Sequence, residues 1–282
     1  MSTREFSWKT IDGLKIYGKY WSPDNGIKGV VCLVHGMGEH INRYEHVAEM
    51  LTDHGYALIG YDHRGHGQSE GQRGHTPSYD YLLNSVDDLL SKAQEYFPET
   101  PQILYGHSMG GGLVLNYALQ WQPQIAGVIA SSPWLKLAFE PPKALVTLAK
   151  VVNKVWPSFS QSTKLDAKAI SRDAAVVKAY EDDPLVHDKI SSGFYLTTYQ
   201  AGLWALDHAD ELHLPLLLFH GTDDQLTSHE ASKEFAKKAG DLVTFRLFGG
   251  AYHEIHNDLC KQELFELMIN WLDSRVGNEE EE

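Results

Sequence analysis

The chain has 282 residues, of which 43% are hydrophobic, so we expect a folded domain with a sizeable core and not a disordered chain. Its formal net charge of −14 repels nucleic-acid phosphates, and we expect no nucleic-acid partner. The two cysteines, Cys32 and Cys260, belong to no CxxC pair, which argues against a disulfide framework and a cysteine zinc site.

Neither end of the sequence resembles a targeting or membrane-spanning segment. The N-terminus, MSTREFSWKT, lacks the apolar stretch of a signal peptide. No uncharged apolar run approaches the roughly 20 residues that a spanning helix needs. We therefore expect a cytoplasmic protein. Residues 277–282, GNEEEE, are predicted to form a solvated acidic tail.

The elements follow an alternating pattern along the chain. Residues 6–21 alternate apolar and polar positions around the turn dipeptide Asp12-Gly13, which predicts a β-hairpin or meander. Short apolar runs then predict buried strands at 29–34, 56–61, 102–106, 125–130, 215–219 and 242–248. Helical patterns follow at 43–54, 79–97, 109–121, 229–239 and 258–275. This order predicts an α/β fold with a mostly parallel central sheet and helices on both faces.

One interval, residues 134–210, interrupts the alternation. It has helical patterns, is rich in aromatic residues, and holds Pro141, Pro142, Pro157 and Pro184. We predict that it forms a helical cap or lid over the C-terminal edge of the sheet. Residues 1–133 and 211–276 would then form the catalytic core.

The segment Gly106-His107-Ser108-Met109-Gly110 matches the G-x-S-x-G pattern of a nucleophile elbow. An apolar strand precedes it and a helical pattern follows, which is the context that the pattern requires. Such a turn places the serine at a helix N-terminus, where backbone N–H groups favour developing negative charge. We predict that Ser108 is a nucleophile; the alternative is a glycine-rich turn that only opens a helix.

A serine hydroxyl needs a base that accepts its proton. Candidates follow two later strands, at the sheet edge where Ser108 is expected: Asp223 and Asp224 after 215–219, and His253 after 242–248, with His256 three residues further on. We favour His253 because it lies nearer the strand end. The strand positions alone leave the acid open between Asp223 and Asp224. The acid would orient the imidazole and stabilise its charged form.

A second glycine-containing turn, His35-Gly36-Met37-Gly38, follows the strand at 29–34. Glycines let the backbone turn so that an N–H faces the reacting carbonyl. We predict the backbone N–H groups of Met37 and Met109 as donors of an oxyanion hole. The alternative is a turn that ends the strand and has no catalytic donor.

Six segments together resemble the monoacylglycerol lipase and lysophospholipase family of α/β hydrolases: HGMGEHINRY (35–44), YDHRGHGQSEG (61–71), GHSMGG (106–111), DPL (183–185), HGTDD (220–224) and GAYHEIH (250–256). The resemblance covers most of the chain, and its first and last segments are the most specific. It implies the α/β-hydrolase fold, the catalytic triad Ser108, Asp224 and His253, and the oxyanion donors Met37 and Met109. It implies no metal or organic cofactor.

The resemblance also implies which residues surround a glycerol head group: Glu39, Arg43, His107, Tyr180 and His256. Glu39 and Arg43 are four residues apart and can form a local ion pair, so a purely structural pair is the alternative. His107 could likewise be buried for support only. Some family members have a cysteine three residues after the acid, where this chain has Thr227. We therefore expect no sensitivity to thiol reagents at this position.

The predicted cap is basic, whereas the rest of the chain is acidic: residues 136–178 carry a net charge of +5 and the remainder −19. Within 141–156, the polar positions Lys143, Thr147, Lys150 and Lys154 form one helical stripe, away from the apolar positions Leu145, Leu148, Val151, Val152 and Val155. The pattern fits a helix that contacts a membrane or micelle, or a cap helix that packs its apolar face on the core. The sequence leaves both open.

These features predict a serine hydrolase that cleaves carboxylic esters through an acyl-enzyme on Ser108. The expected substrate is a monoacylglycerol, and the products are a free fatty acid and glycerol. A lysophospholipase or a short-chain carboxylesterase is the alternative within the hydrolases, and a proline-type aminopeptidase is less favoured. A non-catalytic binding protein of the same fold is disfavoured because all three members of the triad are present.

Overall fold

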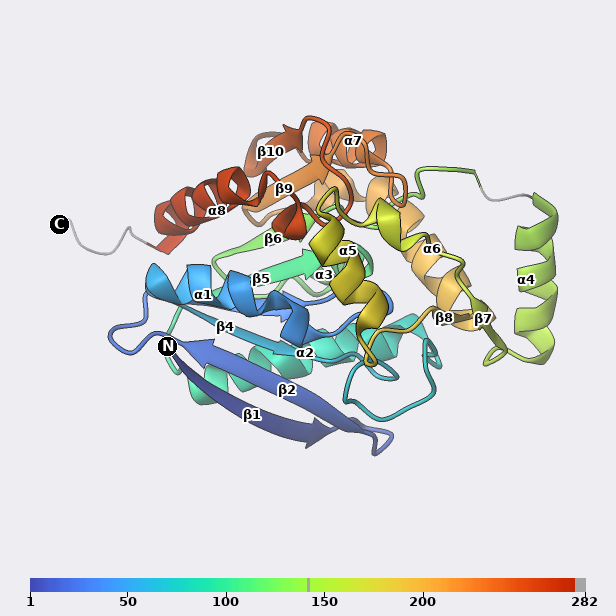
Figure 1. The fold of residues 1–282 in the computed structure, drawn as a ribbon, viewed down its shortest axis with the longest axis horizontal. Coiled ribbons are helices and arrows are strands. Elements are labelled where there is room, and N and C mark those ends of the chain that lie inside the picture. Colours follow the sequence, from blue (N-terminus) through green and yellow to red (C-terminus); the bar gives the residue numbers. More distant parts are fainter. Residues whose placement is uncertain (141–142, 277–282) are drawn as a thin grey trace.

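The computed structural model describes residues 1–140 and 143–276. Its central sheet has eight strands in the order β1-β2-β4-β3-β5-β6-β9-β10 (Figure 1). The strands are β1 (Ser2–Lys9), β2 (Lys15–Ser22), β3 (Gly29–Val34), β4 (Tyr56–Tyr61), β5 (Gln102–His107), β6 (Gly127–Ser131), β9 (Leu216–Gly221) and β10 (Val243–Phe248). β1 and β2 form the predicted hairpin, and all strands from β3 onwards in this sheet run parallel to one another.

Helices cover both faces of the sheet, as predicted. α1 (Glu45–Asp53) and α8 (Lys261–Val276) cover one face, and α2 (Tyr79–Tyr96), α3 (Met109–Trp121), α6 (Ser192–Asp207) and α7 (His229–Ala239) cover the other. Successive side chains of β3 enter the two cores in turn, since Val30 and Cys32 pack on the α3 side and Val31 and Leu33 on the α1 side. This two-sided burial explains why the central strands are continuous apolar runs. The α/β-hydrolase fold class is confirmed.

The chain between β6 and β9 contains α4 (Lys143–Val155), β7 (Ser160–Ser162), α5 (Ala174–Asp182), β8 (Lys189–Ser191) and α6. β7 and β8 pair as a small antiparallel sheet that the sequence did not predict, because three residues are too few to show a period of two. α6 buries Phe194, Ala205 and Leu206 in the same core as α3. The division into a core and a cap over 134–210 stays a prediction.

Short 3-10 helices complete the described chain: η1 (Ile41–Tyr44), η2 (Ala167–Ala169), η3 (Ala209–Glu211), η4 (Gly240–Leu242) and η5 (Ile255–Asn257). Pro141, Pro142 and the predicted acidic tail at 277–282 lie outside the described residues. Within the part of the chain that the structure describes, every helix is too short or too polar to span a bilayer.

Candidate active site

Ser108 lies in a tight turn between β5 and α3. Its φ and ψ angles, 56° and −117°, lie outside the regions that side-chain-bearing residues favour. A Cβ at Gly110 would collide with the carbonyl oxygens of Val34 and His35, and one at Gly106 would collide with the carbonyl of Gly110. Close packing against the end of β3 therefore requires a glycine at 110, and close packing of β5 against the start of α3 requires one at 106.

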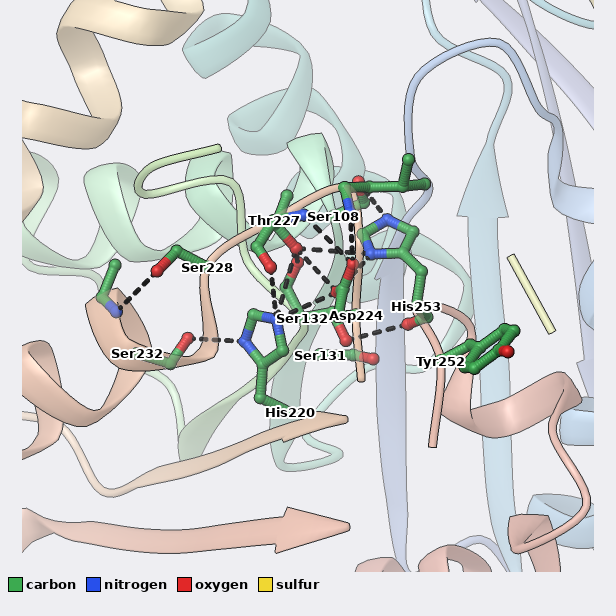
Figure 2. Close-up of polar contacts among 12 residues, drawn as sticks. Ser108, Ser131, Ser132, His220, Asp224, Thr227, Ser228, Ser232, Tyr252 and His253 are labelled. Atoms are coloured by element: carbon green, nitrogen blue, oxygen red, sulfur yellow. Dashed lines mark hydrogen bonds and ion pairs between the residues drawn. The ribbon is translucent and has the colours of Figure 1, made fainter. Parts of the chain in front are cut away.

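Three side chains meet at the carboxyl edge of the sheet (Figure 2). The Nε2 atom of His253 lies 2.8 Å from the Oγ atom of Ser108. The Nδ1 atom of His253 lies 2.7 Å from Oδ2 of Asp224. Ser108 follows β5, Asp224 follows β9 and His253 follows β10, so the parallel strands bring together residues that are far apart in the sequence.

The structure separates the two alternatives that the sequence left open. Asp223 is exposed, and its carboxylate accepts a hydrogen bond from the hydroxyl of Thr222. His256 is buried in η5, and neither of its ring nitrogens has a hydrogen-bond partner among the described residues. Asp224 and His253 are thus the acid and the histidine that form a chain with Ser108.

Asp224 and His253 stabilise each other's charged forms. Burial opposes ionisation of Asp224, but His253 and the hydrogen bond from His220 outweigh it and hold the pKa of the carboxyl well below its usual value. Burial also lowers the pKa of His253, but the Asp224 carboxylate outweighs that effect, so the pKa is raised. The ionised carboxylate therefore accepts the Nδ1–H of His253, and in the neutral form of the ring Nε2 is left to accept the proton of Ser108.

The turn predicted to hold the oxyanion donor passes beside the nucleophile. A Cβ built on Gly36 would lie 3.2 Å from Cβ of Ser108. Met109 is the first residue of α3, directly after the serine. Within the described chain, the backbone N–H groups of Met37 and Met109 donate no hydrogen bond to the protein. Both amides are thus free for an oxyanion, and this role stays a prediction.

Glu39 and Arg43, predicted near a head group, belong to a buried ionic cluster. Nη1 of Arg43 lies 2.7 Å from Oε2 of Glu39 and 2.8 Å from Oε1 of Glu254, and Nη2 lies 2.7 Å from Oε2 of Glu254. The Oε1 atom of Glu39 accepts hydrogen bonds from the backbone N–H of Gly36 and the hydroxyl of Tyr44. The predicted local ion pair is present, and its polar atoms are largely satisfied within the protein.

Glu254 was not predicted, although it directly follows His253. Burial opposes its charge, but Arg43 outweighs that effect and holds the pKa of Glu254 at about 2. Burial instead raises the pKa of Glu39. One feature of the sequence could have indicated its role. Glu254 is an acidic residue next to His253, which was expected to be buried, so Glu254 would need a buried cationic partner. Through this cluster, Arg43 joins the turn at 35–38 to the loop that contains His253.

The remaining predicted head-group residues lie around the same region. The guanidinium carbon of Arg43 lies 4.7 Å from the ring centroid of Tyr180, which comes from α5. The rings of His107 and His253 have centroids 4.8 Å apart, and His107 and His256 are equally close. Burial lowers the pKa of His107 to about 3 and lowers that of His256 as well, so both rings are uncharged. Their contact with a substrate stays a prediction.

Two further side chains contact the acid. The hydroxyl of Thr227 lies 2.9 Å from Oδ2 of Asp224 and 3.0 Å from the backbone oxygen of Ser132. The Nε2 atom of His220 lies 2.9 Å from the same carboxylate oxygen. Thr227 therefore contacts the acid directly. His220 was not predicted to belong to the site, although it directly follows the strand predicted at 215–219 and opens the HGTDD segment.

Comparisons with known proteins agree with this geometry. A family model described as serine aminopeptidase, S33, matches residues 25–260. The monoacylglycerol lipase of Mycolicibacterium smegmatis is 34% identical over 278 residues, which cover 98% of this chain and 99% of that protein. The monoglyceride lipase of Rattus norvegicus is 31% identical over 271 residues, which cover 94% and 89% of the two chains. An uncharacterized abhydrolase domain-containing protein of Dictyostelium discoideum is 36% identical over 93% of this chain, which spans 28% of that longer protein.

Solved structures of monoacylglycerol lipases are also similar to this chain. The monoacylglycerol lipase of Paleococcus ferrophilus is 35% identical, with a TM-score of 0.85 over 92% of this chain and 99% of that one. A soluble variant of the monoglyceride lipase of Saccharomyces cerevisiae, in complex with a substrate analog, is 26% identical, with a TM-score of 0.85 over 98% and 97% of the two chains. The chain therefore belongs to the serine aminopeptidase S33 family and, among the α/β hydrolases, to the monoacylglycerol lipase family.

Proposed function

We propose that the protein hydrolyses monoacylglycerols to a free fatty acid and glycerol through an acyl-enzyme on Ser108. The observation that carries the proposal is the unbroken hydrogen-bonded chain from Ser108 through His253 to Asp224. The similarity to monoacylglycerol lipases over nearly the whole chain supports the choice of ester.

The first half of the reaction forms the acyl-enzyme. The Oγ atom of Ser108 attacks the ester carbonyl while His253 Nε2 accepts the hydroxyl proton. The charge that develops on the carbonyl oxygen would be held by the N–H groups of Met37 and Met109, each worth about 3–4 kcal/mol of the barrier. When the intermediate collapses, the ester C–O bond breaks and the glycerol oxygen leaves with the proton from His253.

The second half releases the fatty acid. A water molecule attacks the acyl carbon while His253 Nε2 accepts one of its protons. Collapse of this second intermediate breaks the bond to Ser108 Oγ, which takes the proton back from His253. The steps need no metal or organic cofactor.

The proposed head-group region consists of Glu39, Arg43, His107, Tyr180 and His256. The guanidinium of Arg43 already donates to the carboxylates of both Glu39 and Glu254, so we propose that Glu39 and Arg43 shape this region and do not bond the glycerol directly. The uncharged His107 and the hydroxyl of Tyr180 are better suited to contact the two free hydroxyls of a monoacylglycerol.

A substrate panel tests the proposed ester class. We expect kcat/KM for a monoacylglycerol to exceed that for the lysophosphatidylcholine with the same acyl chain by about tenfold or more. The guanidinium of Arg43 is already paired with two carboxylates, so it would not compensate for the desolvation of the phosphate. Keeping the acyl chain constant isolates the head group. A preference for the lysophospholipid or for p-nitrophenyl butyrate would instead assign a lysophospholipase or a short-chain carboxylesterase.

We also propose that α4 and the residues after it contact a lipid surface that contains the substrate. α4 stands at the rim of the molecule beside α6 (Figure 1). Val151, Val155 and Trp156 are 57%, 84% and 60% exposed, and they are accompanied by the exposed Lys150 and Lys154. An exposed apolar patch flanked by lysines suits an anionic membrane surface. The side chains of Lys143, Leu145 and Leu148, which belong to the predicted stripes, lie outside the described residues.

Liposome flotation tests this contact. With anionic vesicles, we expect the double substitution Val155→Ser and Trp156→Ser to reduce the bound fraction several-fold, because it removes two exposed apolar side chains without touching the triad. The control is Ile11→Ser, which removes a side chain that is 90% exposed in the β1–β2 turn. Equal flotation of the wild type and the double variant would end the proposal of a lipid surface at α4.

A further inference from the structure

His220 lies beside the acid of the proposed triad, and the mechanism above gives it no part. It is the fifth residue of β9, four positions before Asp224, and its side chain is fully buried. Its Nε2 atom lies 2.9 Å from Oδ2 of Asp224, the same oxygen that lies 2.7 Å from Nδ1 of His253 (Figure 2). One carboxylate oxygen therefore lies between two imidazoles.

The other ring nitrogen determines where the proton of His220 is. Nδ1 lies 2.8 Å from the hydroxyl of Ser232 on α7. Burial lowers the pKa of His220, so the ring is neutral and has a single N–H. The Asp224 carboxylate can only accept, so the hydrogen must be on Nε2, and the hydroxyl of Ser232 donates to Nδ1. Ser232 thus donates to His220, and His220 donates to Asp224.

The rest of the carboxylate is also occupied. Oδ1 of Asp224 accepts hydrogen bonds from the backbone N–H groups of Leu226, at 2.7 Å, and Thr227, at 3.1 Å. The hydroxyl of Thr227 has one proton and two acceptors within reach, Oδ2 of Asp224 and the backbone oxygen of Ser132. The Nε2 atom of His220 also lies 3.3 Å from the backbone oxygen and from the hydroxyl of Thr227, but its contact with Oδ2 of Asp224, at 2.9 Å, is clearly the shortest. Its N–H is therefore directed mainly at that oxygen.

We propose that His220 is a positioning residue whose Nε2–H holds Oδ2 of Asp224 against His253 and shares the charge of the carboxylate, so that it sets the pH at which His253 becomes a base. A donor to a carboxylate weakens the attraction of that carboxylate for a neighbouring proton. Without His220, Asp224 would attract the proton of His253 more strongly, and its side chain would be freer to rotate. The inference rests on the proposed triad, but not on the choice of ester.

Other titratable groups also face these two histidines. The ring of His107 lies against His253, and the charges of Glu254 and Glu39 act on His253 from the loop after β10 and the loop after β3. On the α7 side, the ring of His229 lies 6.3 Å from that of His220. None of these groups changes in a substitution of His220, so a changed pH profile reports the His220–Asp224 contact.

The test compares His220→Leu with His220→Gln. Leucine removes the donor, whereas the glutamine amide can still donate to Asp224. We expect the leucine variant to lose about tenfold in kcat/KM on the pH plateau and to shift the acidic limb of the profile upward by about half a pH unit. We expect glutamine to restore most of both. Rates with p-nitrophenyl butyrate are divided by the concentration of active sites, which is titrated with a fluorophosphonate. A variant that is partly unfolded is then not mistaken for one with a slower reaction.

A matched control and a second readout separate this role from simple packing. His63→Leu removes another fully buried histidine, which bonds the backbone of His35 and not the triad, and should leave the acidic limb unchanged. The downfield proton NMR signal of the N–H between His253 and Asp224 reports the titration of His253 without turnover. If the enzyme were inactive, the proposed function would be refuted, but this signal would still test the role of His220. An unshifted acidic limb and an unshifted NMR titration in His220→Leu would overturn the inference.

Discussion

Replacing Ser108 with alanine is expected to lower kcat by about 10⁴- to 10⁶-fold, since the oxyanion donors and substrate binding alone retain only a small part of the rate enhancement. The attacking oxygen is lost, while His253 keeps its contact with Asp224. Steady-state kinetics with a monoacylglycerol or p-nitrophenyl butyrate measure the effect. The fold should persist, because the side chain of Ser108 makes its one described hydrogen bond to His253.

Ser85→Ala is the matched control for this substitution. Ser85 is also buried, but its hydroxyl donates to the backbone oxygen of Tyr81 within α2, away from the triad. We expect it to keep wild-type turnover. If Ser108→Ala kept more than a tenth of the wild-type kcat, another residue would have to be the nucleophile.

Replacing Arg43 with methionine is expected to reduce the free energy of unfolding by about 3–5 kcal/mol, because it leaves two buried carboxylates without their shared cation. The side chains of Arg43, Glu39 and Glu254 are only 9%, 3% and 4% exposed, so water cannot replace the guanidinium. Urea unfolding at pH 7 measures the change. Arg246→Met is the control, since Arg246 and its partner Glu263 are both about half exposed, and it should cost less than about 1 kcal/mol.

The pH dependence of this effect has a definite sign. In the methionine variant, the two carboxyl groups would be buried side by side, and their pKa values should rise above the ordinary value of 4.5. A carboxyl group whose pKa is raised in the folded state destabilises the protein above its unfolded pKa, and the penalty disappears as the pH falls below it. The difference from the wild type should therefore be smaller at pH 5 than at pH 7. A deficit like that of Arg246→Met at pH 7 would contradict the role of Arg43.

Much of the fold follows from local patterns in the sequence. The strands at 29–34 and 56–61 and the helices at 109–121 and 229–239 occur with the predicted bounds, because each is a strong apolar pattern flanked by turn residues. The helix predicted from residue 43 begins at Glu45, since residues 41–44 form a 3-10 turn. The β7–β8 pair was missed because contacts between segments, and not its own sequence, stabilise it.

The site was predicted to the extent that topology determines it. Parallel strands end at one edge, so residues that follow β5, β9 and β10 could be expected to meet, and Ser108, Asp224 and His253 do. Glu254 and His220 were missed for a different reason. Arg43 and Glu254 are 211 residues apart, so nothing local indicates that they pair. His220 directly follows the strand predicted at 215–219, but the sequence does not show toward which neighbour its ring turns.

The most direct test of the account is whether the imidazole activates this one serine. We predict that a fluorophosphonate adds once to the folded protein, that mass spectrometry locates the adduct on Ser108, and that His253→Ala slows the reaction at least 100-fold. Folded protein that forms no adduct at Ser108, or a His253→Ala variant that reacts at the wild-type rate, would contradict it.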